Sequence, residues 1–204
     1  MLTVGIAHPL MLRGGSEADC LWAIQALKDD YDVSLVTTGP VDWKDLNEYY
    51  GTSIMSGEVA VLRPLTARLT GYPGAAARGA LHERFCSKVA DRFDILLSGC
   101  NPCDFGRPAI HRIGDVGWNL DLLEKCEDLP RGAQLAIHRE GMLRKAYLGF
   151  ARALAKPSGR DLFAGEDVML VNTDWTGRII RERYPNARLA KAYPPVVGQF
   201  EPLP

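Results

Sequence analysis

Short apolar runs alternate with longer segments of mixed polarity along the whole chain. The runs are rich in valine, isoleucine and leucine, and several are continuously apolar, which is typical of strands buried on both faces of a parallel sheet. They predict strands at Thr3–Ala7, Val33–Thr37, Val59–Leu62, Asp94–Leu97, Ala109–Ile113, Val168–Asn172 and Arg188–Ala192.

Four segments between these runs carry apolar residues at helical spacing and predict helices. Before the first helix, Ser16-Glu-Ala-Asp19 fits a capping box. The second helix is expected at residues 76–92 and the third at about 134–155, and the fourth begins at Thr173 or Asp174. In chain order, the inward faces are expected at Cys20, Leu21, Ile24 and Leu27; at Leu81, Phe85 and Val89; at Leu143, Ala146, Tyr147, Phe150 and Leu154; and at Ile179, Ile180 and Tyr184.

This alternation predicts one α/β domain with three layers around a mostly parallel sheet. Right-handed crossovers then bring the loops that follow the strands to one edge of that sheet. Pro194-Pro195 ends the regular pattern, so we expect a domain over residues 1–193 and the start of a linker over residues 194–204.

Composition mainly excludes classes of protein. With 24 basic and 25 acidic residues the net charge is −1, which offers no electrostatic footprint for nucleic acid. No apolar run is long enough to cross a bilayer, and the chain does not open with the basic region of a signal peptide. The five cysteines are odd in number and irregularly spaced, which favours a reducing cytoplasm.

The junction between the first strand and the first helix carries the main chemical signal. Gly14-Gly15 allows the backbone to approach a ligand closely, and the free N–H groups and dipole of a helix start suit a phosphate. The spacing is not G-x-G-x-x-G, so the dinucleotide fingerprint is absent, and a tight turn without a ligand stays open. His8 lies at the carboxyl end of the first strand, where α/β folds bind ligands, although taken alone it is better explained as a hydrogen-bonded edge histidine.

Four segments, taken in order, resemble glycosyltransferase family 4, whose members are retaining enzymes of the GT-B fold. His8-Pro-Leu-Met-Leu-Arg-Gly-Gly-Ser-Glu17 resembles the family's glycine loop, and residues 167–176 resemble its strand-then-helix segment. Residues 108–115 resemble the strand whose end lines the acceptor side of the cleft, and Tyr193-Pro-Pro-Val196 resembles the entry into the interdomain linker. The resemblance covers essentially the whole chain and implies a Rossmann-like domain, the N-terminal half of a GT-B fold.

The resemblance implies an enzyme of polysaccharide biosynthesis in which two domains face each other across a cleft. The N-terminal domain holds a sugar or lipid-linked sugar acceptor, and the C-terminal domain holds a nucleotide-sugar donor as co-substrate, without a metal or other cofactor. The donor-site residues belong to that C-terminal domain, which we expect to be absent from this chain. The chain alone is therefore expected to be inactive.

The resemblance also assigns roles to residues. Gly14 and Gly15 would hold the donor diphosphate and stabilise charge on the leaving phosphate through backbone amides. In many relatives the strand that matches Ala109–Ile113 ends in a histidine near the transferred sugar, and here that place falls on Gly114-Asp115. We therefore assign the catalytic role to Asp115, while a turn or helix-cap aspartate stays open.

Acceptor binding is assigned to His8, Trp118 and Asn119. An indole after Asp115 could stack on a sugar ring, or it could simply hold its own loop in place. The same region of the surface should present an apolar strip where the second domain docks.

Two further features have plain alternatives. Cys100-Asn-Pro-Cys103 has the spacing of redox and zinc motifs, but even with Cys126 and His111 the pattern is unlike known zinc modules, so two free thiols in a loop at the cleft edge are expected.

The third helix carries basic side chains that would suit weak contact with the inner membrane surface, or an ordinary solvated face: Arg139, Arg144, Lys145 and Arg152.

Two rival functions remain open. One is a non-catalytic binding module of the same fold that works with a separate partner chain. The other is a nucleotide-sugar epimerase-like α/β enzyme, which would bind free UDP or GDP by itself.

Overall fold

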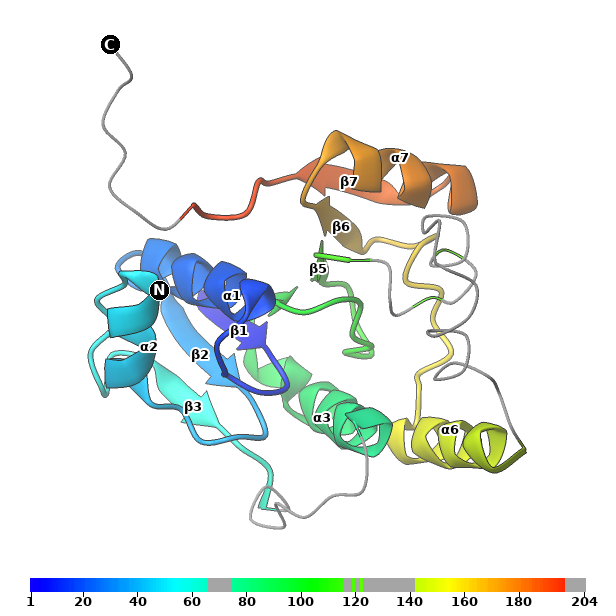
Figure 1. The fold of residues 1–204 in the computed structure, drawn as a ribbon, viewed down its shortest axis with the longest axis horizontal. Coiled ribbons are helices and arrows are strands. Elements are labelled where there is room, and N and C mark those ends of the chain that lie inside the picture. The colour runs from blue at the N-terminus through cyan, green and yellow to red at the C-terminus, as the bar shows by residue number, and fades with distance from the viewer. Residues whose placement is uncertain (66–74, 116–118, 120–121, 123–141, 197–204) are drawn as a thin grey trace, which may run out of the picture.

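The computed structural model describes residues 1–65, 75–115, 119, 122 and 142–196. Within them, seven strands form an all-parallel sheet in the order β3-β2-β1-β4-β5-β6-β7 (Figure 1), so the predicted α/β fold with a parallel sheet is confirmed. The strands are β1 (Thr3–Ala7), β2 (Asp32–Val36), β3 (Ala60–Leu62), β4 (Ile95–Ser98), β5 (Ile110–Ile113), β6 (Val168–Val171) and β7 (Arg188–Lys191).

Helices cover both faces of this sheet and give a Rossmann-like arrangement of three layers. The helices are α1 (Gly15–Leu27), α2 (Trp43–Tyr50), α3 (Ala75–Val89), the 3-10 turn η2 (Ala90–Arg92), α6 (Met142–Ala155) and α7 (Asp174–Arg183). None of the helices in the described ranges is long and apolar enough to span a bilayer.

Alternate side chains of the strands pack into different cores. Val4 and Ile6 of β1 pack with Leu21 and Ile24 of α1, in a core that also includes residues of α2. Ala7 faces the opposite side and packs with α3, and the cluster around Met169 and Ile180 joins β6 to α7. Burial of each such aliphatic side chain contributes about 1.5–3 kcal/mol to the hydrophobic driving force.

The strand order reverses between β1 and β4. From β1 the chain moves outward to β2 and β3, and it then returns to place β4 on the other side of β1. Ala7 pairs with Ser98 at the carboxyl ends of these two strands, and the N–H of Gly99 donates to the carbonyl of Ala7 at 2.9 Å. In open parallel sheets, ligands bind outside the carboxyl ends at such a reversal.

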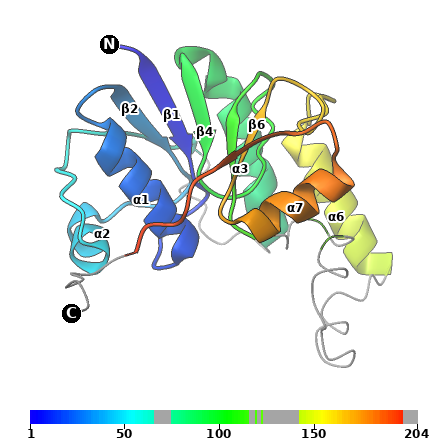
Figure 2. The same ribbon diagram turned by 90° about the horizontal axis from the view of Figure 1, so that it is seen from above.

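The chain leaves β7 and runs back toward α1 and α2 (Figure 2). Arg112 of β5 holds this exit segment, because its guanidinium donates to Asp19 of α1 at 2.8 Å and to the carbonyl of Ala192. Residues 194–196 contain no helix or strand, and residues 197–204 lie outside the described part, so the predicted linker over residues 194–204 stays a prediction.

The structure corrects one prediction about a helix start and adds one helix that was not predicted. The helix α1 begins at Gly15 with Gly14 as its N-cap, so Ser16 lies inside the first turn and the predicted capping box is wrong. The helix α2 was not predicted; it is a short helix capped by the side chain of Asp42, and only Leu46 and Tyr50 are buried in it.

The inward face of α6 also differs from the prediction. Ala146 and Phe150 are exposed, whereas Ala151 and Ala155 are buried in a small cluster with Ala80 of α3. Small residues occupy this contact because two helices pack closely there. Arg152 is exposed as expected, while residues 134–141 and the side chains of residues 142–145 lie outside the described part.

Candidate functional site

The start of α1 is open at the reversal of strand order. Its N-cap residue Gly14 provides no side-chain hydrogen bond, whereas the side chains of Asp42 and Thr173 cap α2 and α7. The N–H groups in the first turn of any α-helix lack intrahelical partners. Those of α1 are therefore available to an anionic ligand, with the favourable end of the helix dipole behind them.

Neither glycine of the turn is required by the backbone conformation. Gly14 has φ −162° and ψ 175°, an extended conformation that any residue adopts. A Cβ atom at Gly15 would meet nothing within 4 Å, and at Gly14 it would meet the Oε2 atom of Glu17 at 2.5 Å. Gly15 therefore faces open space, while Gly14 faces a flexible carboxylate.

The two glycines differ in how their amides are used. The N–H of Gly14 donates to the hydroxyl of Tyr50 at 2.5 Å, and that hydroxyl donates to the carbonyl of Gly14 at 2.7 Å. Because the Gly14 amide is already bonded, Gly15 and the residues that follow it are the ones whose amides could contact a diphosphate as assigned.

His8 lies beside the same turn. Its Nε2 is 3.1 Å from the Oγ of Ser16, and the Ser16 hydroxyl donates to Glu17 at 3.0 Å. A hydroxyl that donates its proton to Glu17 accepts from an Nε2–H, which leaves Nδ1 as the acceptor nitrogen. That Nδ1 is buried and has no hydrogen-bond partner among the described residues. Burial lowers the pKa of His8, although the charge of Glu17 opposes the shift, so the ring is neutral at pH 7.

Asp115 follows β5, and the loop after β4 contacts it at the same edge of the sheet. The hydroxyl of Ser98 donates to the carbonyl of Asn101 at 2.5 Å, and Asn101 has φ 58°, in the left-handed region that asparagine tolerates. Its Nδ2 then donates to Asp115 at 3.4 Å. Cys100, between Ser98 and Asn101, is half-buried, and burial raises the pKa of its thiol.

The carboxylate of Asp115 is thus placed by the ends of β4, β5 and β6. Asp115 is exposed, and the neighbouring carbonyl of Gly114 accepts from the Nδ2 of Asn172 at 2.8 Å. The structure brings Gly15, His8 and Asp115 to one edge of the sheet. Such a set can hold an anion at the helix start and a hydroxyl compound at the carboxylate.

Asn119, which was also assigned to acceptor binding, is not brought there. The side chain of Asn119 donates to the hydroxyl of Tyr184 at 2.8 Å, at the C-terminal end of α7 and toward the opposite edge of the sheet. Its Oδ1 accepts from the N–H of Leu122 at 3.2 Å, which is a local turn contact. Trp118 lies outside the described residues.

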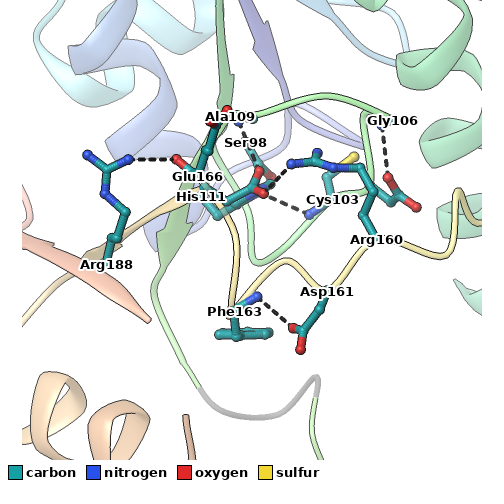
Figure 3. Close-up of polar contacts among 12 residues, drawn as sticks. Ser98, Cys103, Gly106, Ala109, His111, Arg160, Asp161, Phe163, Glu166 and Arg188 are labelled. Atoms are coloured by element: carbon teal, nitrogen blue, oxygen red, sulfur yellow. Dashed lines mark hydrogen bonds and ion pairs between the residues drawn. The ribbon is translucent and has the colours of Figure 1, made fainter. Parts of the chain in front are cut away.

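A second polar cluster lies buried between β5 and the segment before β6. His111 contacts Asp167 at 3.0 Å, and that carboxylate also accepts from Arg160 at 2.7 Å and from the N–H of Ala109 at 2.9 Å (Figure 3). The N–H of Cys103 donates to the other ring nitrogen of His111 at 3.3 Å. Burial lowers the pKa of His111. Because the His111 and Asp167 side chains are fully buried and each is hydrogen-bonded, this cluster is structural.

Cys100 and Cys103 form no metal site with the residues that the structure describes, and Cys126 lies outside them. Cys103 is buried in the core beside Cys86, whereas Cys100 is half-buried, so only one thiol of the pair lies at the edge. Both thiols are free, as predicted. Among the residues that the structure describes, no group of three or more histidine, cysteine or carboxylate side chains could hold a metal ion.

Two hollows lie near this edge. One of about 340 Å³ separates α1 from β4, β5 and β6, beneath the exit segment. The other, of about 590 Å³, lies between α7 and β7. Among the described residues, large apolar side chains are exposed within five residues after the end of a strand, where the docking strip was expected, at Leu12, Leu65, Trp175, Tyr193 and Val196.

Sequence reasoning missed Tyr50, Ser16, Cys100 and Asn101 as parts of this site. The strand-end position of Ser98-Gly99 was a usable signal for the last two, because both follow a predicted strand. No protein-family model matches the chain, and a search of curated proteins finds no match.

Proposed function

We propose that this chain is the acceptor-side, N-terminal domain of a retaining glycosyltransferase of the GT-B fold, which transfers a sugar from a nucleotide-sugar to a hydroxyl of a glycan or lipid-linked glycan. The observation that carries the proposal is the open start of α1 at the reversal of strand order, where Gly15 has free space in front of it. The resemblance to glycosyltransferase family 4 indicates the reaction. The open start of α1 is a suitable site for the donor diphosphate, the most highly charged group in that reaction.

The first-turn amides of α1 would stabilise the leaving diphosphate. During transfer, the bond between the anomeric carbon and the diphosphate oxygen breaks, and the acceptor oxygen bonds to that carbon on the same face. Negative charge then grows on the departing phosphate, and preorganised N–H donors lower the free energy of that state. Glu17 now lies against Gly14, so its carboxylate turns away when the diphosphate arrives, and the Ser16 hydroxyl becomes free to donate.

Asp115 would receive the acceptor. Its exposed carboxylate accepts a hydrogen bond from the attacking hydroxyl and takes its proton as the new bond forms. The buried, neutral His8 lies beside the glycine turn and holds the Ser16 hydroxyl there through its Nε2. The donor nucleotide would be bound by the C-terminal domain that the resemblance implies.

The test is a donor-hydrolysis and transfer screen of the complete protein against a panel of nucleotide-sugars. We expect one donor to be consumed, and Gly15→Val to lower turnover at least about tenfold, since a β-branched side chain blocks the approach to the amides. Gly149→Val is the matched control, because Gly149 is also an exposed helix glycine with nothing within 4 Å of its Cβ position.

Two outcomes would contradict the proposal. Equal turnover of the two variants at saturating donor would remove the glycine turn from the reaction. Tight binding of free UDP or GDP by this chain alone would favour an epimerase-like enzyme instead.

A further inference from the structure

The glycine turn is held by a residue from another helix. The hydroxyl of Tyr50, the last residue of α2, accepts from the N–H of Gly14 at 2.5 Å and donates to the carbonyl of Gly14 at 2.7 Å. The carbonyl of Leu12 also lies within 3.4 Å of it. One phenol thus contacts the peptide groups on both sides of Gly14, and the two residues are 36 positions apart in the sequence.

The position of this hydroxyl is itself well fixed. Tyr50 is 4% exposed, and its ring packs in the core with Leu21 and Ile54. Gly51, with φ 69°, ends α2 in the left-handed conformation directly after it. Burial raises the pKa of Tyr50, so the hydroxyl keeps its proton and remains both donor and acceptor at neutral pH.

Holding Gly14 determines where the next amides point. With its own N–H bound to Tyr50, Gly14 is held in its extended conformation as the N-cap of α1, and the chain enters the helix with Gly15 exposed. A turn of two glycines without such a contact would sample many conformations, and ordering it on binding would cost free energy. The contact therefore preorganises the amides that follow.

We propose that Tyr50 is a positioning residue that fixes the Gly14 peptide so that the first-turn amides of α1 bind the diphosphate of the donor. This inference rests on the proposed function for the identity of the ligand. It adds Tyr50, a residue of α2, to the residues that form the diphosphate site. Neither the glycine motif nor the positions of the strand ends indicate this residue.

The test compares Tyr50→Phe with Tyr49→Phe. Phenylalanine at position 50 keeps the buried ring and removes only the hydroxyl. Tyr49 is the neighbouring residue of the same helix, is 52% exposed, and its ring contacts Arg13; its variant keeps that ring and is a matched control. Two measurements are made: binding of inorganic pyrophosphate to this chain, and kcat and KM of the complete protein.

We expect Tyr50→Phe to weaken pyrophosphate binding about fivefold, the loss of roughly one hydrogen bond, and to lower kcat with little change in the acceptor KM. Amide hydrogen exchange of Gly14 should also accelerate, while Tyr49→Phe changes none of these. A merely structural hydroxyl would lower the thermal midpoint and leave pyrophosphate affinity and kcat unchanged, which would overturn the inference.

Different results would overturn the proposed function and the positioning role of Tyr50. A complete protein without transferase activity, whose pyrophosphate binding still depends on Tyr50, would overturn the proposed function and keep the positioning role. An active transferase in which Tyr50→Phe matches the control in pyrophosphate affinity and kcat would overturn the positioning role alone.

Discussion

The Nε2 atom of His8 lies 3.1 Å from the Oγ atom of Ser16, so a side chain from the end of β1 contacts the first turn of α1 across the glycine turn. This contact lies beside Gly15 and beneath the open helix start. Because His8 is 3% exposed, its ring is part of the floor of the site rather than a mobile surface group.

Stability should depend on pH through His8. Burial lowers its pKa below the ordinary value of 6.5, so the unfolded chain binds the proton more readily. The contribution of the neutral His8 ring to the unfolding free energy is complete above pH about 6.5. It is lost as the pH falls toward the pKa that His8 has in the folded protein. Glu17, which favours the proton, and His82, which opposes it, are the charged groups that act on the ring.

We therefore expect the wild-type chain to lose up to about 1 kcal/mol more unfolding free energy than His8→Gln between pH 7.5 and pH 5.5. Glutamine keeps a side-chain donor for Ser16 and removes the titration. The lowered pKa of His111 contributes equally to both proteins, so urea unfolding of the pair isolates His8. Equal losses would show that the ring titrates normally in the fold.

Gly15→Ala should separate folding from binding. Alanine fits the open space at this position without strain and restricts the unfolded chain, so we expect a gain of about 0.5 kcal/mol in unfolding free energy. Pyrophosphate affinity should fall, because the methyl group occupies the approach to the amides. Gly149→Ala, as control, should stabilise the fold without changing affinity; an unchanged affinity in Gly15→Ala would contradict the site.

Asp115→Asn should lower kcat/KM for transfer by about 10²-fold in the complete protein, since an amide cannot take the acceptor's proton. The amide still reaches Asn101, so the local hydrogen bond is preserved in kind. Asp30→Asn removes a charge from an exposed loop far along the chain from the site and serves as the control. Comparable kcat/KM values in the two variants would exclude Asp115 as the base.

Asp167→Asn should destabilise the fold by about 3 kcal/mol, because the carboxylate is the buried counter-charge of Arg160 and the acceptor for His111. The cluster contains none of the residues assigned to the reaction, so the transfer activity of the folded protein should be kept. Chemical denaturation together with activity per folded molecule checks both parts. A loss below about 1 kcal/mol would mean that the charge is solvated rather than buried.

The strands were predictable because each of the seven short apolar runs forms one strand of the sheet, and β1 starts and ends where its apolar pattern does. The helix α2 was not predictable in the same way. It has few apolar positions, and only the pair Leu46 and Tyr50 at helical spacing faces the core. Similarly, the inward face of α6 depends on α3, whose position relative to α6 no local pattern specifies.

The candidate site was predictable only in part. Gly15, His8 and Asp115 follow strands, so the parallel topology was sufficient to place them at one edge. The contact between Tyr50 and Gly14 joins segments that are distant in sequence, and no motif encodes it. Asn119 was assigned from its nearness to Asp115 in the sequence, but the chain carries it to Tyr184 instead.

The most direct measurement is a titration of the isotope-labelled chain with inorganic pyrophosphate, followed by amide NMR shifts. We predict saturable shifts at Gly15, Ser16 and Glu17. The N–H of Thr176 should stay unchanged, because the side chain of Thr173 already caps the start of α7. Absence of shifts at the three α1 amides, or equal shifts at the starts of both helices, would contradict a phosphate site at the glycine turn.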